Sequence, residues 1–297
     1  AEFDVEAHKT VGLVGRSRAE AARPRCDVFW NNEIAHTIAL ADEGRLASYD
    51  SPSAADIPEA FRDPERRWTG FAARARVLIV NTALADPAEI TRVSDLLDPR
   101  WRGQVAMARP RTGTTLTHAA ALYLPPEAGG LGPERAREFL GQLKAAGVNF
   151  VQSNGQVMHR VRDGHFAFGL TDTDDFNVAR EEGFPVAVVY PDQGEGELGT
   201  LLIPNTVAIL ADAPHPEAAR RLVDFILSRE VEERLAFARG AQIPLRGDVP
   251  RPPHVRAASD FRAAPIDYRA LGRELPARQA ELEELFADCA ARCSPWR

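Results

Sequence analysis

Three carboxylates close together are the strongest chemical feature of the sequence. Asp172, Asp174 and Asp175 follow the apolar run Phe166–Leu170, which is short enough to be a buried strand. Open α/β sheets place their ligand crevices at the carboxyl ends of strands, so we expect these side chains in such a crevice. Anions this close repel one another unless a cation or strong hydrogen-bond donors offset their charge. The cluster therefore predicts a site for a hard cation or an amine, with Asp174 and Asp175 as metal ligands.

Two other roles fit the same carboxylates. A carboxylate that precedes a helix commonly caps its N-terminus. An apolar strand that ends in Asp-x-Asp also resembles the haloacid-dehalogenase-like phosphatases, in which Asp172 would be the nucleophile and Asp174 the general acid beside Mg²⁺. That chemistry needs a later lysine, and no lysine follows Lys144 in this sequence. A magnesium-dependent phosphatase-like hydrolase is therefore the less favoured alternative.

Polar residues after a second predicted strand are candidates for the opposite side of the site. Asn31, Asn32 and Glu33 directly follow the strand Cys26–Trp30. We predict that they contact the ligand and that Glu33 is a further metal ligand, although capping of the next helix would place the same residue types there. Glu6, near the start of the first predicted helix, is another candidate for ligand contact.

Two predicted helix starts could bind a negatively charged part of the ligand. Thr112-Gly-Thr-Thr115 and Ser153-Asn-Gly155 each follow a predicted strand. The free N–H groups of a helix N-terminus bind phosphate, phosphonate or carboxylate. We therefore predict that Thr114, Thr115 and Asn154 bind ligand, with simple N-capping as the competing role.

Composition narrows the class of protein. The chain has 297 residues, 44% of them hydrophobic and 27% charged, as in ordinary globular proteins. Its net charge of −7 argues against a nucleic-acid partner, which needs a basic face. Three cysteines are too few for a disulfide scaffold, and we interpret Cys289 and Cys293, four residues apart on a predicted helix, as incidental.

Strands and helices alternate along the chain, which predicts an α/β fold with a largely parallel sheet. Strands are expected over residues 26–30, 76–81, 104–108, 148–152, 166–170, 185–190 and 200–210. The principal helices are expected over residues 8–22, 33–43, 114–124, 133–146, 154–163, 215–227, 229–239 and 276–292.

Eight segments in a fixed order resemble the extracellular solute-binding proteins of bacterial ABC importers, in the branch related to ferric-ion-binding proteins. The segments are Glu6–Leu13, Cys26–Glu33, Arg74–Asn81, Trp101–Val105, Gly113–His118, Gly169–Asp175, Tyr190–Gln193 and Gln242–Leu245. The resemblance implies a two-lobed type II periplasmic-binding fold with no catalytic activity and no cofactor. It also implies a monomer in the periplasm or outside the cell, after removal of a signal sequence, that delivers a small ligand to a membrane permease.

Two strands are candidates for the hinge crossings of such a fold. Val77–Asn81 and Leu201–Ile209 enclose a segment of the size of a domain. With the resemblance, they predict one lobe from residues 1–80 and 206–297 and a second lobe from residues 81–205. Family members usually begin with a further strand and helix, so the resemblance implies that these elements either exist elsewhere in the full protein or are missing from the first lobe.

The sequence does not decide between two classes of cargo. Ferric-binding relatives carry an adjacent tyrosine pair where Asp174 and Asp175 stand in this chain, so the sequence does not support iron binding by phenolates. The carboxylates favour a cargo that contains a cation, such as ferric iron with a small anion. An organic anion or a zwitterion such as an aminophosphonate is the alternative.

Overall fold

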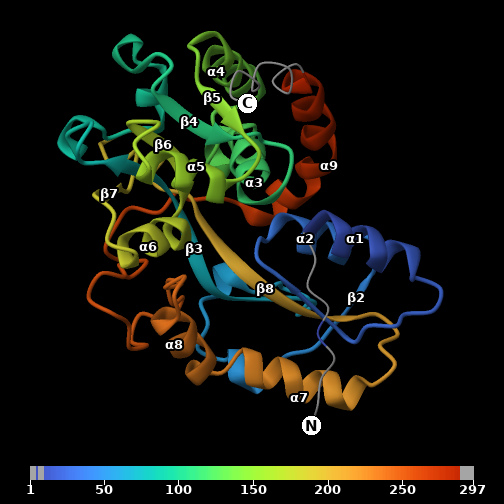
Figure 1. Ribbon diagram of the computed structural model, residues 1–297. Helices are drawn as coiled ribbons and strands as arrows, with labels where there is room; N and C mark the ends of the chain where they lie inside the picture. Colours follow the sequence, from blue (N-terminus) through green and yellow to red (C-terminus); the bar gives the residue numbers. More distant parts are fainter. Residues whose placement is uncertain (1–4, 6–9, 288–297) are drawn as a thin grey trace.

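The computed structural model describes residue 5 and residues 10–287, and its strands form one eight-stranded sheet (Figure 1). The strands are β1 (Val28–Asn31), β2 (Leu46–Ala47), β3 (Thr69–Asn81), β4 (Val105–Ala108), β5 (Asn149–Val151), β6 (Phe168–Asp172), β7 (Val186–Val189) and β8 (Leu202–Leu210). Their order is β1-β8-β3-β6-β4-β5, with β2 also paired to β8 and β7 to β3.

Helices cover both faces of this sheet. They are α1 (Thr10–Ala19), α2 (Ala35–Asp42), α3 (Gly113–Leu122), α4 (Pro133–Ala145), α5 (Asn154–Arg162), α6 (Thr173–Glu181), α7 (Pro216–Ile226), α8 (Arg229–Phe237) and α9 (Tyr268–Leu285). Most expected elements are confirmed, and α2 ends two residues before Gly44, whose φ of 72° suits a residue without a Cβ. No helix within the described part of the chain is both long and apolar enough to cross a membrane.

The prediction of a largely parallel sheet is wrong. Among the described strands, only the pairs β4–β5 and β4–β6 are parallel, whereas β3 and β8 pair antiparallel with each other and with their remaining neighbours. The reason is that the chain runs out through the sheet along β3 and returns along β8, so these two central strands must point in opposite directions. Alternation of strands and helices along the sequence cannot detect this reversal.

The long strand β3 divides its pairing between two parts of the sheet. Residues 69–75 pair with β8, and residues 76–81 pair with β6 and β7. We call β1, β2, β8 and the first part of β3 the first sheet segment, and β4 to β7 with the rest of β3 the second sheet segment. A β-bulge interrupts the β3–β8 pairing between Phe71 and Ala73, and Ala72 there has a φ of 39°.

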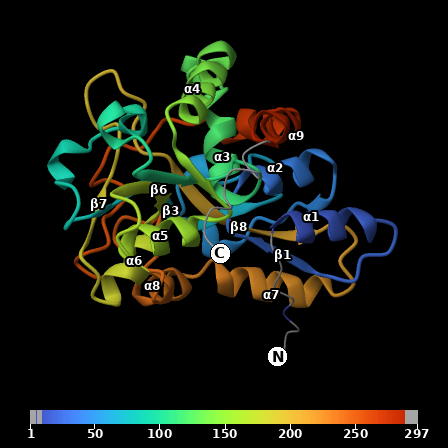
Figure 2. The same ribbon diagram turned by 45° about the horizontal axis from the view of Figure 1, so that its top comes forward.

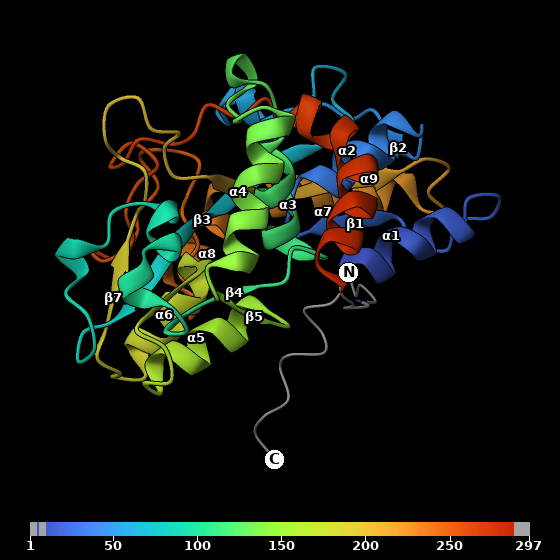
Figure 3. The same ribbon diagram turned by 90° about the horizontal axis from the view of Figure 1, so that it is seen from above.

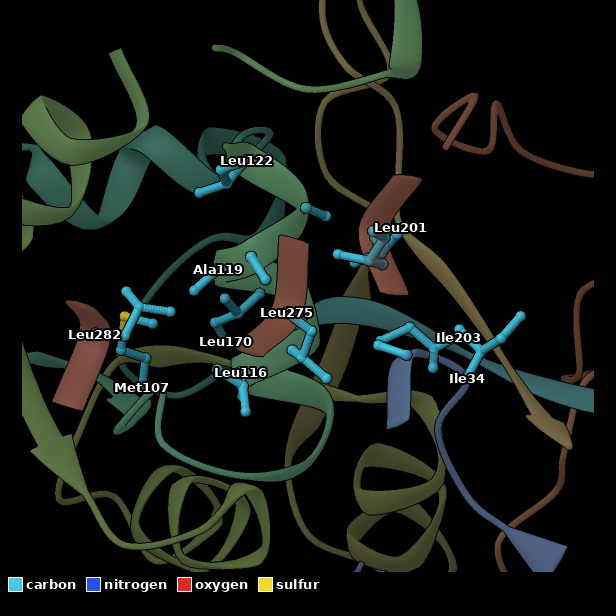
Figure 4. Close-up of a cluster of buried hydrophobic side chains, with 14 of the residues drawn as sticks. Ile34, Met107, Leu116, Ala119, Leu122, Leu170, Leu201, Ile203, Leu275 and Leu282 are labelled. Atoms are coloured by element: carbon cyan, nitrogen blue, oxygen red, sulfur yellow. The ribbon is translucent and has the colours of Figure 1, made fainter. Parts of the chain in front are cut away.

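Helix α9 joins the two segments through the largest hydrophobic core. It packs against α2, beside the first segment, and against α3, beside the second (Figure 2). Leu275 and Leu282 of α9 lie in one buried cluster with Leu116 of α3 and Ile34 before α2 (Figure 4). The predicted helix 276–292 begins earlier than expected because Asp267 caps it, accepting hydrogen bonds from the N–H groups of Arg269 and Ala270. Cys289 and Cys293 lie outside the described residues.

The second sheet segment is covered on both faces, and this arrangement fixes the site. Helices α3 and α4 pack on the face with Met107, while α5 and α6 pack on the face with Ala106 and Ala108 (Figure 3). Because β4, β5 and β6 are parallel neighbours, their carboxyl ends meet at one edge of the sheet. The helices that follow these three strands, α3, α5 and α6, therefore begin at that edge.

Candidate ligand site

The candidate site lies where α3, α5 and α6 begin. Their N-cap residues are Thr112, Ser153 and Asp172, and each has extended backbone dihedrals as a cap requires. Only Ser153 caps with its side chain, which accepts a hydrogen bond from the N–H of Gln156. Three helix N-termini at one sheet edge direct their positive dipole ends toward the same place. This edge therefore has a field that favours negative charge.

Asp172 is the centre of a closed hydrogen-bond network. Its Oδ1 accepts from Arg76 Nη1 at 2.7 Å, and its Oδ2 accepts from Thr114 Oγ1 at 2.6 Å and Asn154 Nδ2 at 2.8 Å. Thr115 Oγ1 donates to Asn154 Oδ1 at 2.8 Å and accepts from Arg76 Nη2 at 3.2 Å. The predicted ligand residues Thr114, Thr115, Asn154 and Asp172 are thus brought together, but much of their hydrogen-bonding capacity is used within the network.

Asp174 and Asp175 are the carboxylates that retain free hydrogen-bonding capacity. Ligand oxygens of Asp172, Asp174 and Asp175 lie within 4.8 Å of one another. Within the described residues, the buried Oδ1 of Asp174 has no hydrogen-bond partner, while Oδ2 of Asp175 accepts from Thr171 Oγ1 at 2.7 Å. The strand ends at Asp172, so helix geometry and not strand alternation places the last two carboxylates.

Both carboxylates resist ionisation. Burial and the nearby negative charges of Asp174 and Asp172 raise the pKa of Asp175 to about 7. Burial also raises the pKa of Asp174, assisted by Asp172 and opposed by Arg74. A cation placed between Asp174 and Asp175 would relieve this repulsion, because an opposite charge favours the ionised form of a carboxyl group.

Arg74 and Arg76 also lie at the candidate site, which their positions in the sequence did not predict. Both lie on β3, two residues apart on the same face of the strand, and both are buried. Arg74 Nη1 is 3.6 Å from Asp174 Oδ2, and its Nη2 donates to Asn205 Oδ1 at 3.1 Å and Gln242 Oε1 at 3.3 Å. Two arginines at alternate positions of an apolar strand were the available signal, since buried charges need partners.

The structure does not bring Glu33 to the carboxylate cluster. Its side chain is fully buried, and it accepts hydrogen bonds from Asn31 Nδ2 at 2.8 Å and Thr117 Oγ1 at 2.9 Å. His36 Nδ1 lies 2.6 Å from Glu33 Oε1, and despite the opposing effect of burial this pairing raises the pKa of His36 and lowers that of Glu33. Glu33 thus stabilises the start of α2 and its contact with α3. Unlike Asp174, it has no carboxylate oxygen without a hydrogen-bond partner.

The other residues predicted on that side have different surroundings. Asn31 is buried in the same network as Glu33, while Asn32 is exposed at the turn that follows β1. Glu6 lies outside the described residues. The predicted residues of the second sheet segment therefore lie together. No described hydrogen bond joins Asn31, Asn32 or Glu33 to them.

The four tyrosines are occupied elsewhere. The hydroxyl groups of Tyr49, Tyr123 and Tyr268 donate to Asp224, Glu281 and the carbonyl of Leu202. Tyr190 packs against Phe261 and under the guanidinium of Arg256. Burial raises the pKa of Tyr123 and Tyr190 to about 12, which disfavours their phenolate forms. A pair of tyrosine ligands at this edge of the sheet is therefore not available.

Comparison with known proteins shows the family. A family model of bacterial extracellular solute-binding proteins matches residues 13–268. Iron uptake protein A2 of Synechocystis sp. is 29% identical over 287 residues, covering 89% of this chain and 78% of that protein. A putative 2-aminoethylphosphonate-binding periplasmic protein of Salmonella typhi is 26% identical over 249 residues, covering 83% of this chain and 71% of that protein.

Solved structures show the same fold. The crystal structure of iron-bound HitA from Pseudomonas aeruginosa superposes with a TM-score of 0.80 at 25% sequence identity, covering 92% of this chain and 87% of that chain. The predicted type II periplasmic-binding fold is thereby confirmed. The phosphatase alternative is wrong, because this family consists of carriers and because Asp172 is held by Arg76. The chain therefore belongs to the bacterial extracellular solute-binding proteins and acts by binding a solute.

Proposed function

We propose that this protein binds a compact solute with a cationic centre at Asp174 and Asp175 and delivers it to the permease of an ABC importer. One observation carries the proposal: two adjacent, partly buried carboxylates with raised pKa values, one with an unpartnered oxygen, at an edge where three helices begin. The carboxylates suit a positive centre and the helix starts suit a negative one. The protein works in the periplasm or outside the cell, as a monomer.

The proposed lobes are residues 1–80 with 206–297 and residues 81–205. The divided pairing of β3 and the return along β8 support hinge crossings in these two strands. Between the lobes, Arg74 contacts Asp174 on one side and Gln242 on the other. Closure around a solute would exclude water here and strengthen each charged contact.

Ferric iron together with a small anion is the first candidate cargo. Asp174 and Asp175 supply the hard oxygen ligands, and the anion lies at the helix starts near Thr114, Thr115 and Asn154. The similarity to iron uptake protein A2 and to iron-bound HitA supports this choice. The ligand set differs from a phenolate site because Asp174 and Asp175 replace tyrosines.

A zwitterion such as 2-aminoethylphosphonate is the second candidate. The arrangement that favours it is the separation of charge across the site, with two carboxylates for an ammonium group and helix N-termini for a phosphonate. The similarity to the putative 2-aminoethylphosphonate-binding protein supports it as well. Arg76 cannot serve the phosphonate fully, because its Nη1 and Nη2 already bind Asp172 and Thr115.

Calorimetric titration of the full chain with ferric citrate and, separately, with 2-aminoethylphosphonate tests the function and separates the two cargoes. We expect the wild type to bind ferric citrate, and the variant Asp174→Asn/Asp175→Asn to lose at least about a hundredfold in affinity, since each lost charge-assisted contact is worth about 1.5–3 kcal/mol. Asparagine keeps the shape of aspartate, so the loss would report charge.

A matched variant controls for the change in net charge. Glu230→Gln/Glu233→Gln removes two exposed carboxylates from the first turns of α8 and should bind as the wild type does. Binding of 2-aminoethylphosphonate alone would replace the first cargo with the second. Tight binding of either solute that is equal in the wild type and the Asp174→Asn/Asp175→Asn variant would refute the site.

A further inference from the structure

A cavity that Asp174 and Asp175 do not line shares only Arg76 with the residues placed in the candidate site. It has a volume of about 450 Å³, and its walls come from α3, α4, the segment 191–201 and the segment 264–266. We call it the α3–α4 cavity and define it by Arg76, His118, Leu122, Leu131, Arg135 and Leu201. Leu122 at the end of α3 and Leu201 just before β8 are labelled in Figure 4. A cavity of this size accommodates a small organic molecule.

Two buried nitrogens at this cavity have no partner among the described residues. Arg76 has no exposed surface, and its Nε is unpaired although Nη1 and Nη2 bind Asp172 and Thr115. His118 is 9% exposed, and its Nδ1 is also unpaired. Buried polar groups are nearly always satisfied, and the Nε–H of arginine can only donate. An atom that satisfies Arg76 here must therefore be a hydrogen-bond acceptor.

Of the three arginines in the lining, Arg135 is the one that no ion pair among the described residues neutralises. Arg76 is paired with Asp172 and Arg92 with Glu197, and burial raises the pKa of the remaining acid, Asp192, to about 6. Arg135 is exposed and has no ion-pair partner in the described part of the chain. Burial and the charge of Arg76 lower the pKa of His118 to about 3, so this ring is neutral and can donate one hydrogen bond.

The rest of the lining is apolar. Leu122 and Leu201 are buried, and Leu131 and Phe139 are partly buried around the cavity. An apolar body would remove this surface from water, which favours binding. An apolar wall with a few convergent polar groups is the usual composition of a small-molecule site.

We infer that the α3–α4 cavity is a second ligand site, for a small amphipathic monoanion with an aromatic or aliphatic body. The anionic head accepts hydrogen bonds from Arg76 and His118 and is attracted by Arg135. The apolar body contacts Leu122, Leu131 and Leu201. Asp174 and Asp175 do not line this cavity, so it is not where the cationic centre of the cargo binds, although Arg76 borders both sites.

Fluorescence titration with 8-anilinonaphthalene-1-sulfonate, an aromatic monoanion, tests this inference on the folded full chain. We expect one bound probe per chain. Leu131→Trp, which fills a partly exposed part of the cavity, and Arg135→Glu, which reverses its free charge, should each weaken binding at least about fivefold. Far-ultraviolet circular dichroism and the urea midpoint establish that each variant remains folded.

Matched substitutions elsewhere separate specific binding from adsorption to exposed apolar surface. Leu84→Trp and Arg221→Glu lie at exposed positions that do not line the cavity and should leave probe affinity unchanged. The neutral probe N-phenyl-1-naphthylamine should bind at least about fivefold more weakly than the sulfonate. Equal affinity of both probes would overturn the anionic head, and unchanged binding in Leu131→Trp and Arg135→Glu would overturn the site.

Discussion

Arg76 and Asp172 form a buried ion pair that connects β3 to the end of β6. Arg76 Nη1 lies 2.7 Å from Asp172 Oδ1, and the exposed fractions of the two side chains are 0% and 5%. The same pair is in register across the β3–β6 ladder. Thr114 and Asn154 complete the hydrogen bonding of Asp172, so the first turns of α3, α5 and α6 are held around one carboxylate. This pair neutralises Asp172, so Asp174 and Asp175 are the two carboxylates that we propose to bind a cation.

Removal of Arg76 should lower the stability of the protein, because Asp172 is unfavourable to bury without a counterion. We expect Arg76→Met to lower the free energy of unfolding by about 3–5 kcal/mol, because Asp172 would remain buried without its counterion. In the double variant Arg76→Met/Asp172→Asn, most of this loss should be recovered, since no buried charge remains. Urea unfolding followed by circular dichroism measures both. A double variant no more stable than Arg76→Met would show that the pair contributes through packing and not through charge.

The raised pKa of Asp175 predicts the direction of a pH effect. Asp175 shifts from an ordinary pKa of 3.8 to about 7 on folding. Below about pH 4 the Asp175 carboxyl is protonated in both the folded and the unfolded protein. Between about pH 4 and 7 it is protonated only in the folded protein. The contribution of Asp175 to stability is therefore full at low pH and is lost as the pH rises through about 7.

Asp175→Asn should remove this contribution to the pH dependence. We expect the free energy of unfolding of the wild type, relative to that of Asp175→Asn, to decrease between about pH 5 and pH 8. Glu230→Gln, which changes an exposed carboxylate, should retain the slope of the wild type. Urea unfolding at several pH values measures the difference, and parallel curves for the wild type and Asp175→Asn would contradict the raised pKa.

Glu33 should matter for stability and not for cargo. Its oxygens accept from Asn31, Thr117 and two backbone N–H groups, and His36 lies 2.6 Å away. Glu33→Gln would place an amide N–H against some of these donors, so we expect a loss of about 2–4 kcal/mol in the free energy of unfolding. Calorimetry with ferric citrate should give the wild-type affinity. Lost affinity at unchanged stability would restore Glu33 as a metal ligand.

Gly169 allows the close packing that positions the site. A Cβ at this residue of β6 would lie 2.5 Å from Val157 Cγ1 and 2.6 Å from the carbonyl oxygen of Ala106. Gly169→Ala must therefore separate α5 from β6, and we expect a loss of about 1–3 kcal/mol. Gly141→Ala on α4 meets no atom within 4 Å and should instead add about 0.5–1 kcal/mol. Thermal unfolding of both variants checks this, and a Gly169→Ala protein as stable as the wild type would contradict the packing.

The sequence was sufficient to predict the residues that meet at the carboxyl ends of neighbouring strands. Thr114, Asn154 and Asp172 lie at or shortly after the ends of three strands, and adjacent parallel strands bring such positions together. Arg76 was missed because its partner is 96 residues away, and only the β3–β6 register aligns the two. The role of Glu33 was also hidden, since a cap residue and a metal ligand have the same local sequence.

The directions of the strands could not be read from the sequence. Local periodicity reports where a strand lies, but it does not report that the chain leaves along β3 and returns along β8. The start of α9 was also misplaced, because the cap at Asp267 and the packing of Leu271 and Leu275 set it earlier than residue 276.

Native mass spectrometry with elemental analysis tests the central claim most directly, after equilibration with ferric citrate and gel filtration. We expect one iron per chain in the wild type and in Glu230→Gln/Glu233→Gln, and no retained iron in Asp174→Asn/Asp175→Asn. Retention of iron by Asp174→Asn/Asp175→Asn would contradict the proposal that these two carboxylates hold the cation.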